Sequence, residues 1–110
     1  MYRSTLLIFL IYFCLILKSE VVIDVRTPEE FQIAHIANSS NIEWQNISLI
    51  ESLIPKDEKI YLYCRSGNRS GKARNILIDL GYIDVTNLGS IQSASEKLGK
   101  EIINLQQNTQ

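Results

Sequence analysis

Short apolar runs alternate with amphipathic segments along residues 20–110. Two runs, VVIDV at 21–25 and EKIYLYC at 58–64, are rich in β-branched or aromatic residues and have the length of buried strands. Elsewhere apolar side chains recur at the three- to four-residue spacing of a helix. The pattern therefore predicts helices over TPEEFQIAHI, NISLIESLI and RSGKARNILIDLGY, further strands in SSNIEW and IDVTNLG, and a final helix in SASEKLGKEIINLQQNTQ that fades into a polar tail.

Local signals mark the ends of several helices. Thr27 followed by Pro28 is a favourable helix start, because threonine caps the first turn and proline suits the first helical position. Pro55 ends the helix before it, and Gly81 is the residue expected just past a helix end.

Strands that alternate with helices favour an α/β domain. We expect a central parallel sheet of four to five strands flanked by helices on both faces. The 110 residues suffice for one domain, and the apolar fraction of 45% and charged fraction of 21% are ordinary for a globular protein.

The amino end has a different character. Arg3 precedes an unbroken apolar run from Leu6 to Leu17, which is too short to span a bilayer and typical of a secretory signal. We predict a signal peptide over residues 1–19 and a folded domain over 20–110, exported and most consistent with the periplasm. If the signal stays uncleaved, it would anchor the domain to the membrane. Cys14 lies within this apolar run.

Charge and cysteine content narrow the function classes. The net charge is −1, and without residues 1–19 nine positive and twelve negative charges remain, which argues against nucleic acid as a partner. Cys64 is then the single cysteine and cannot form an internal disulfide. With one histidine, His35, the sequence favours neither a zinc site nor a Cys–His protease, and we expect no metal or cofactor.

Cys64 is followed by a polar turn, RSGNRS, and then by a helix. In parallel sheets, ligands bind at the carboxyl ends of the strands. Backbone N–H groups of the turn and the amino end of the helix would favour a thiolate, as would Arg65 and Arg69. The pattern predicts a lowered Cys64 pKa and a site for a small oxyanion. A structural role as a small buried apolar residue is the alternative for an isolated cysteine.

The chain resembles the single-domain rhodaneses, the thiosulfate sulfurtransferases, and most of all their small exported members. The resemblance covers about residues 21–89 and is strongest in VVIDVRTPEEFQIAHI and in YLYCRSGNRSGKARNILIDLGYIDVTNLG. It implies that Cys64 is a nucleophile that carries a persulfide. It also implies an active-site loop in which Arg69 is the closing arginine and a supporting pair, Asp24 and Arg26, on a neighbouring strand end. The loop that binds the substrate would comprise Arg65, Ser66, Gly67, Asn68, Arg69 and Ser70.

The chain departs from the family pattern at three places. Asn38 stands where a glycine is usual, and asparagine is the next best residue for a positive φ. Ser90 stands where a second glycine is common after Gly89, and the usual tryptophan-containing stretch is missing after Ile91. That stretch helps to wall the active site in relatives.

Three functions remain open from the sequence. The first is a sulfurtransferase, in which a thiolate takes sulfane sulfur from thiosulfate and passes it to cyanide or a thiol, with no general base required. The second is a relative of phosphatases and arsenate reductases, whose loops place the arginine six residues after the cysteine rather than five. The third is a rhodanese-like module that carries or binds sulfur without turnover. The absence of a C-x-x-C motif disfavours a disulfide oxidoreductase.

Overall fold

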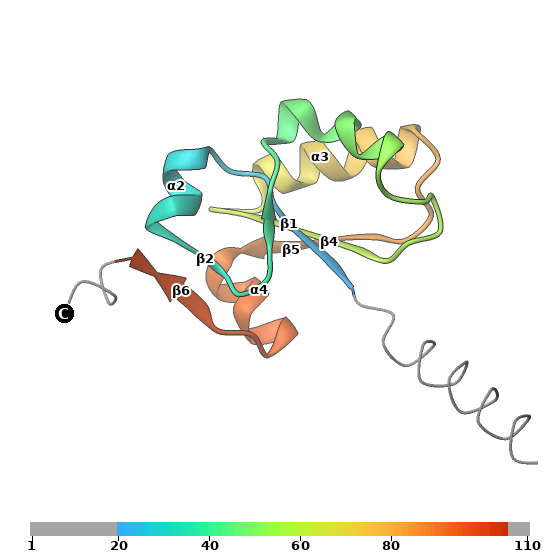
Figure 1. Cartoon of the computed structure of the whole chain (residues 1–110). Helices are drawn as coiled ribbons and strands as arrows, with labels where there is room; N and C mark the ends of the chain where they lie inside the picture. Colours follow the sequence, from blue (N-terminus) through green and yellow to red (C-terminus); the bar gives the residue numbers. More distant parts are fainter. Residues whose placement is uncertain (1–19, 106–110) are drawn as a thin grey trace, which may run out of the picture.

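The computed structural model describes residues 20–105, which form a four-stranded parallel sheet with helices on both faces (Figure 1). The predicted signal peptide, residues 1–19, and the tail, residues 106–110, lie outside the described residues. The sheet has the order β3-β1-β4-β5. Its strands are β1 (Val21–Asp24), β3 (Ser40–Asn41), β4 (Ile60–Cys64) and β5 (Val85–Ser90).

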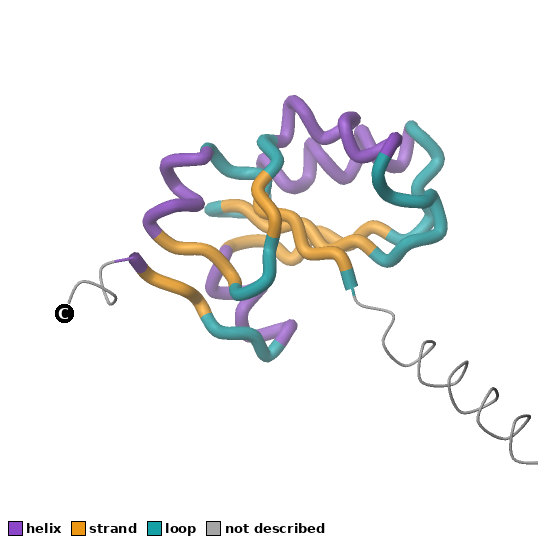
Figure 2. The backbone as a smooth tube through the Cα atoms, viewed as in Figure 1, coloured by secondary structure: helices purple, strands orange, loops and turns teal. Residues whose placement is uncertain are grey.

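The helices form two layers around this sheet. Helix α3 (Asn68–Asp79) and the 3₁₀ helix η1 (Trp44–Ser52) cover one face, and α4 (Ile91–Leu98) covers the other (Figures 1 and 2). Helix α2 (Pro28–Ile33) leads into β2 (Ala34–Ile36), which pairs in antiparallel register with β6 (Ile102–Asn104) beside the main sheet. The predicted α/β architecture is confirmed, with four strands in its sheet.

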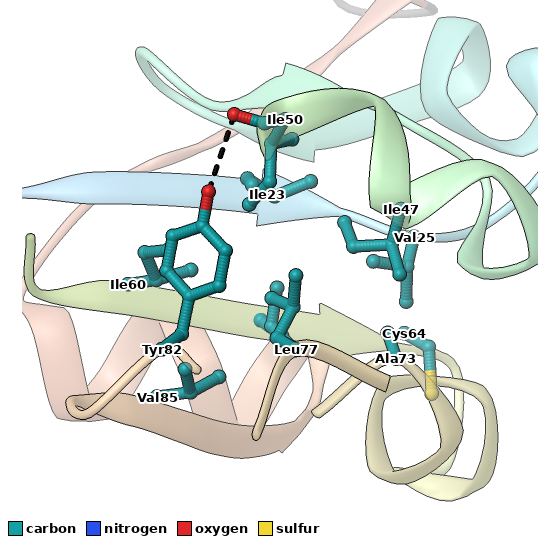
Figure 3. Packing of buried hydrophobic residues seen from close by; sticks show 11 residues of the cluster. Ile23, Val25, Ile47, Ile50, Ile60, Cys64, Ala73, Leu77, Tyr82 and Val85 are labelled. Atoms are coloured by element: carbon teal, nitrogen blue, oxygen red, sulfur yellow. Dashed lines mark hydrogen bonds between the residues drawn. The ribbon is translucent and has the colours of Figure 1, made fainter. Parts of the chain in front are cut away.

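Strand β4 separates two apolar cores because its side chains alternate between the faces of the sheet. On one face, Ile60, Leu62 and Cys64 pack under α3 and η1, and Figure 3 shows Cys64 beside Ala73 at the end of this cluster. On the other face, Tyr63 packs with residues of α4. The full cluster under α3 comprises Ile23, Val25, Ile47, Ile50, Ile60, Leu62, Cys64, Ala73, Leu77, Tyr82 and Val85.

The sequence signals for the helix ends correspond to real caps. Thr27 and Glu30 form a reciprocal capping box at the start of α2, in which each side chain bonds to the backbone N–H of the other residue. Gly81 follows α3 with φ of 103°, a conformation that glycine adopts without strain. Asn38 has φ of 65°, as its substitution for a glycine predicted.

Three predicted elements need correction. The helix expected over 27–36 ends at Ile33, and the remainder forms β2. The strand expected over 39–44 is reduced to Ser40–Asn41. The final helix ends at Leu98, where Gly99 adopts a left-handed C-cap, and the chain then forms β6 rather than continuing as a fading helix. The apolar pair Ile102–Ile103 packs as a strand because β2 offers a partner edge.

Candidate active site

Cys64 lies at the carboxyl end of β4, and three residues separate it from the first residue of α3. Gly67 is the N-cap of this helix and has φ of 95°. A Cβ atom at Gly67 would lie 3.3 Å from the Cα of Gly89 on β5, so a larger residue would be both strained and crowded. This tight turn brings the amino end of α3 over the cysteine.

The sulfur accepts hydrogen bonds from its own loop. The Gly67 N–H group lies 2.9 Å from Cys64 Sγ, and the Ser70 hydroxyl oxygen lies 3.3 Å from it. Cys64 is fully buried, which raises the pKa of its thiol. Hydrogen bonds from the Ser70 hydroxyl and from backbone N–H groups of Ser70, Ser66 and Gly67 outweigh burial, so the Cys64 pKa falls below its ordinary value.

Cys64 shows structural features expected of both interpretations that the sequence left open. Its burial within the apolar cluster under α3 is what a structural cysteine would show. The polar contacts at Sγ are different, because an inert buried thiol does not need several donors directed at it. Together they describe a thiol held at the base of a loop that stabilises negative charge.

A second polar contact joins the loop to strand β5. Ser70 is buried, and its hydroxyl oxygen lies 2.6 Å from Asn87 Oδ1. Asn87 Nδ2 donates to the Gly67 carbonyl at 2.9 Å, and Oδ1 accepts from the Gly89 N–H at 2.9 Å. Asn87 thus contacts the N-cap of α3 and the serine that bonds to the sulfur.

Arg69, the expected closing arginine, forms an ion pair with Glu30 of α2. Its two guanidinium nitrogens reach the two carboxylate oxygens at 2.7 and 3.0 Å. This pairing holds the pKa of Glu30 down to about 2 and raises that of Arg69. Arg69 also interacts electrostatically with Cys64.

Asp24 and Arg26 form a buried ion pair at the end of β1. The Arg26 backbone N–H and Nε bond to Asp24 Oδ1, and Nη2 bonds to Oδ2 at 2.6 Å. Nη2 also donates to the Ala34 carbonyl at 2.6 Å. Burial lowers the pKa of Arg26, but its hydrogen bonds to the Asp24 carboxylate and the negative charge of that group outweigh burial and raise it. The pair thus contacts the start of β2 through Ala34. That Asp24 and Arg26 support the cysteine loop stays a prediction.

The remaining loop residues face outward. Arg65, Ser66 and Asn68 are exposed. Arg65 also lines an open groove of about 690 Å³ that runs beside the loop. Other residues of this groove are Arg26, Glu30, Ile33, Ile91, Gln92 and Ile102. Molecules larger than thiosulfate could therefore approach the loop from this side.

Sequence reasoning missed Glu30 and Asn87 as members of the site. Glu30 lies three residues after Thr27, the spacing of a capping box, but its link to Arg69 is not readable from local sequence. Asn87 lies between Val85 and Leu88 inside β5, and a polar side chain within this short strand is the available signal. Ser90, which replaces a usual glycine, is the N-cap of α4 and accepts from the Ser93 N–H.

The described residues can also be compared with the requirements for a metal site and for a membrane-spanning helix. Among residues 20–105, no three histidine, cysteine, aspartate or glutamate side chains gather closely enough to hold a metal ion. Within the same residues, none of the helices has the length and apolar character needed to cross a membrane.

Comparison with known proteins matches this arrangement to one family. A family model described as the rhodanese-like domain matches residues 15–97. Thiosulfate sulfurtransferase PspE of Escherichia coli is 34% identical over 95 residues, covering 84% of this chain and 91% of its own. Adenylyltransferase and sulfurtransferase UBA4 of Candida albicans is 36% identical over 94 residues, and the match covers 77% of this chain but 22% of that relative.

Solved structures give the same result. A structure described as rhodanese with anions from Escherichia coli superposes with a TM-score of 0.68 at 28% identity, covering 78% of this chain and 99% of that chain. A rhodanese-like domain protein from Staphylococcus aureus superposes with a TM-score of 0.63 at 32% identity, covering 76% of this chain and 81% of that chain. The sequence match, the shared fold and the cysteine loop together show that this chain belongs to the rhodanese-like domain family.

Proposed function

We propose that the protein is a sulfurtransferase that moves sulfane sulfur from thiosulfate, or a similar donor, through a persulfide on Cys64 to cyanide or a thiol acceptor. The observation that carries the proposal is the pair of donors at Cys64 Sγ, the Gly67 N–H at 2.9 Å and the Ser70 hydroxyl at 3.3 Å. These donors stabilise a thiolate, which is the nucleophilic form of cysteine.

The reaction has two balanced steps. The Cys64 thiolate attacks the terminal sulfur of thiosulfate, a new S–S bond forms, and the old S–S bond breaks with its electron pair leaving on sulfite. The resulting persulfide anion, Cys64–S–S⁻, keeps the negative charge in the loop. Cyanide then attacks the outer sulfur, thiocyanate leaves, and the thiolate is regenerated. Since neither step moves a proton, the site needs no general base.

The loop favours a small sulfur atom over a phosphate group. Cys64 is fully buried at the base of the loop, and Arg69 follows it by five residues. The related phosphatase loops carry one residue more and form a wider ring of N–H groups. We expect this shorter ring to admit the terminal sulfur of thiosulfate and to hold a phosphorus atom too far from the thiolate. A misplacement of about 1 Å can cost roughly 100-fold in rate.

The activity is tested by measuring thiocyanate production from thiosulfate and cyanide by the full chain. We expect activity that Cys64→Ser abolishes and that Cys14→Ser, the matched substitution of the other cysteine, leaves unchanged. Aryl phosphate hydrolysis is measured in parallel and is expected to be negligible. Thiocyanate production that survives in Cys64→Ser would refute the proposal. Phosphatase turnover lost in Cys64→Ser would favour the phosphatase alternative instead.

We also propose that residues 1–19 export the domain and that its destination is the periplasm. The support is the apolar run from Leu6 to Leu17 after Arg3. A fusion of residues 1–25 to a reporter that is active only outside the cytoplasm should be active. Replacing Leu10 and Leu15 with arginine should abolish reporter activity, because it interrupts the apolar run. Equal reporter activity with and without this interruption would contradict export.

A further inference from the structure

Ser70 has one hydroxyl proton but two acceptors within reach. Its oxygen lies 2.6 Å from Asn87 Oδ1 and 3.3 Å from Cys64 Sγ. A serine hydroxyl donates a single hydrogen bond and can accept others. It therefore cannot donate to the amide oxygen and to the sulfur at the same time, and the state of the sulfur must decide between them.

The orientation of the Asn87 amide is fixed by its other partners. Nδ2 donates to the Gly67 carbonyl, and Oδ1 accepts from the Gly89 N–H. A flipped amide would place its NH₂ group against the Gly89 N–H and its oxygen against the Gly67 carbonyl, which loses both bonds. Oδ1 is thus the atom that faces Ser70, and the shorter distance is the one to Asn87.

The sheet register explains why Asn87 reaches the loop. Asn87 pairs with Leu62 of β4, so its side chain lies on the same face of the sheet as Leu62, under α3. The register then shifts, and Cys64 pairs with Ser90. A Cβ atom at Gly71 of α3 would lie 3.5 Å from Asn87 Nδ2, which shows how closely the helix packs on this amide.

We infer that Asn87 is a positioning residue for the sulfur-transfer step. Its side chain anchors the Gly67 turn and accepts the hydrogen bond of the Ser70 hydroxyl until negative charge on the sulfur makes the sulfur the better acceptor. With a neutral thiol, Ser70 donates to Asn87 and its oxygen can accept from the S–H group. With a thiolate or persulfide anion, the hydroxyl turns to donate to sulfur, and Asn87 Oδ1 keeps the Gly89 N–H as partner. The catalytic part of the inference rests on the proposed function, whereas the hydroxyl switch requires only the thiol.

Charged groups near the loop must be held constant in any test. On α3, Arg69 interacts electrostatically with Cys64 and with Asp24 of β1. Glu30 of α2 is paired with Arg69, and Arg26, which follows β1, is paired with Asp24. None of these residues changes in the variants below, so a difference between variants reflects Asn87 and Ser70.

The first experiment uses the unaltered protein, which avoids any question of folding. The side-chain amide resonance of Asn87 is followed by NMR while thiolate absorbance reports ionisation of Cys64. We expect the Asn87 resonance to move with the same midpoint pH as the absorbance, and to stay still in Cys64→Ser. The exposed Asn75 amide, on the outer part of α3, serves as the control resonance. An Asn87 resonance that does not move as the thiolate forms would overturn the inference.

The second experiment substitutes the acceptor. Asn87→Asp keeps an oxygen for Ser70 but makes it a stronger acceptor, and it removes the donor to the Gly67 carbonyl. We expect the Cys64 pKa to rise and persulfide formation at neutral pH to slow about tenfold, with recovery at higher pH. Asn75→Asp, which adds the same charge at an exposed position of α3, should change either quantity far less.

A Ser70→Ala background separates the hydroxyl from simple charge repulsion. If Asn87 changes the Cys64 pKa through the Ser70 hydroxyl, Asn87→Asp should change that pKa much less when Ser70 is already alanine. An equal change in the Cys64 pKa with serine or alanine at position 70 would refute the inference that Asn87 acts through the Ser70 hydroxyl. The thiolate titration needs no thiosulfate. If the titration shows that Asn87 acts through Ser70 but the protein fails to transfer sulfur, the result would count against the proposed function alone.

Discussion

Two polar clusters lie at the carboxyl ends of neighbouring strands, and they handle charge in opposite ways. At the end of β1, Asp24 and Arg26 are both buried and neutralise each other. At the end of β4, the Gly67 N–H group and the Ser70 hydroxyl contact Cys64, and Arg69, which interacts electrostatically with Cys64, is paired with Glu30. The charges of the first cluster are paired with each other, although Arg26 also lines the groove beside the loop. The second contains donors directed at the sulfur, which supports placing the proposed chemistry there.

Breaking the cluster at the end of β1 should have the largest effect on stability. Asp24→Asn would leave Arg26 buried beside a neutral amide, and loss of one partner of a buried pair costs about 3–5 kcal/mol. Denaturant unfolding measures the loss, with the exposed Asp57→Asn as the matched control. A change in unfolding free energy no larger than that of the control would show that the pair is not structural.

Widening the cluster at the end of β4 should remove catalysis and leave the fold intact. A glycine inserted after Gly67 enlarges the ring of N–H groups, and we expect sulfur transfer to fall by about 100-fold or more. A glycine inserted after Gly99, which also has a positive φ and lies in open space, is the control and should be nearly silent. Comparable activity of the two insertions would mean that loop length does not select the substrate.

Removing the shared arginine should have an intermediate effect. Arg69→Ala is expected to raise the Cys64 pKa and to weaken thiosulfate binding together, since one guanidinium faces both anions. The loss in rate at neutral pH should be modest, about fivefold, because Glu30 already offsets much of the charge. Thiolate absorbance and the KM for thiosulfate are measured beside Arg74→Ala. An unchanged titration curve would show that Arg69 serves only to bind α2.

The Arg69–Glu30 pair should give the smallest effect, seen in the pH dependence of stability. The Glu30 pKa is lowered to about 2, so its contribution is present above the ordinary value of 4.5 and is lost as pH falls toward 2. For this partly exposed pair we expect about 1 kcal/mol or less. Glu30→Gln should remove that part of the acid-induced loss, measured by unfolding between pH 5 and pH 2 against Glu29→Gln. If the free energy of unfolding depends on pH identically in Glu30→Gln and Glu29→Gln, the pair does not contribute to acid stability.

Elements with a strong local pattern could be predicted from the sequence. Strand β4 and helix α3 have clear apolar periods, and a turn with Gly67 between them identified the position of Cys64. The rhodanese-like fold followed from this pattern together with the family motifs. The same reasoning failed after Gly99, because a run as short as Ile102–Asn104 becomes a strand only through pairing with β2, far away in sequence.

The site was predicted in the same uneven way. Donors within the loop follow from the backbone turn itself, so the lowered Cys64 pKa was expected before the structure was known. The partners of that loop come from other elements, Glu30 from α2 and Asn87 from β5, and no local signal connects them to it. For the same reason, the sequence does not show that Arg69 has a carboxylate partner in Glu30.

The central claim is that the loop makes Cys64 an acceptor of sulfane sulfur, and intact-mass measurement tests it most directly. The full chain is incubated with thiosulfate, then with cyanide, and the labelled position is located by peptide mapping. The mass should rise by one sulfur atom at Cys64 and return to its original value with cyanide, while Cys14→Ser behaves like the unaltered protein. A protein that never gains sulfur, or that gains it equally in Cys64→Ser, would contradict the claim.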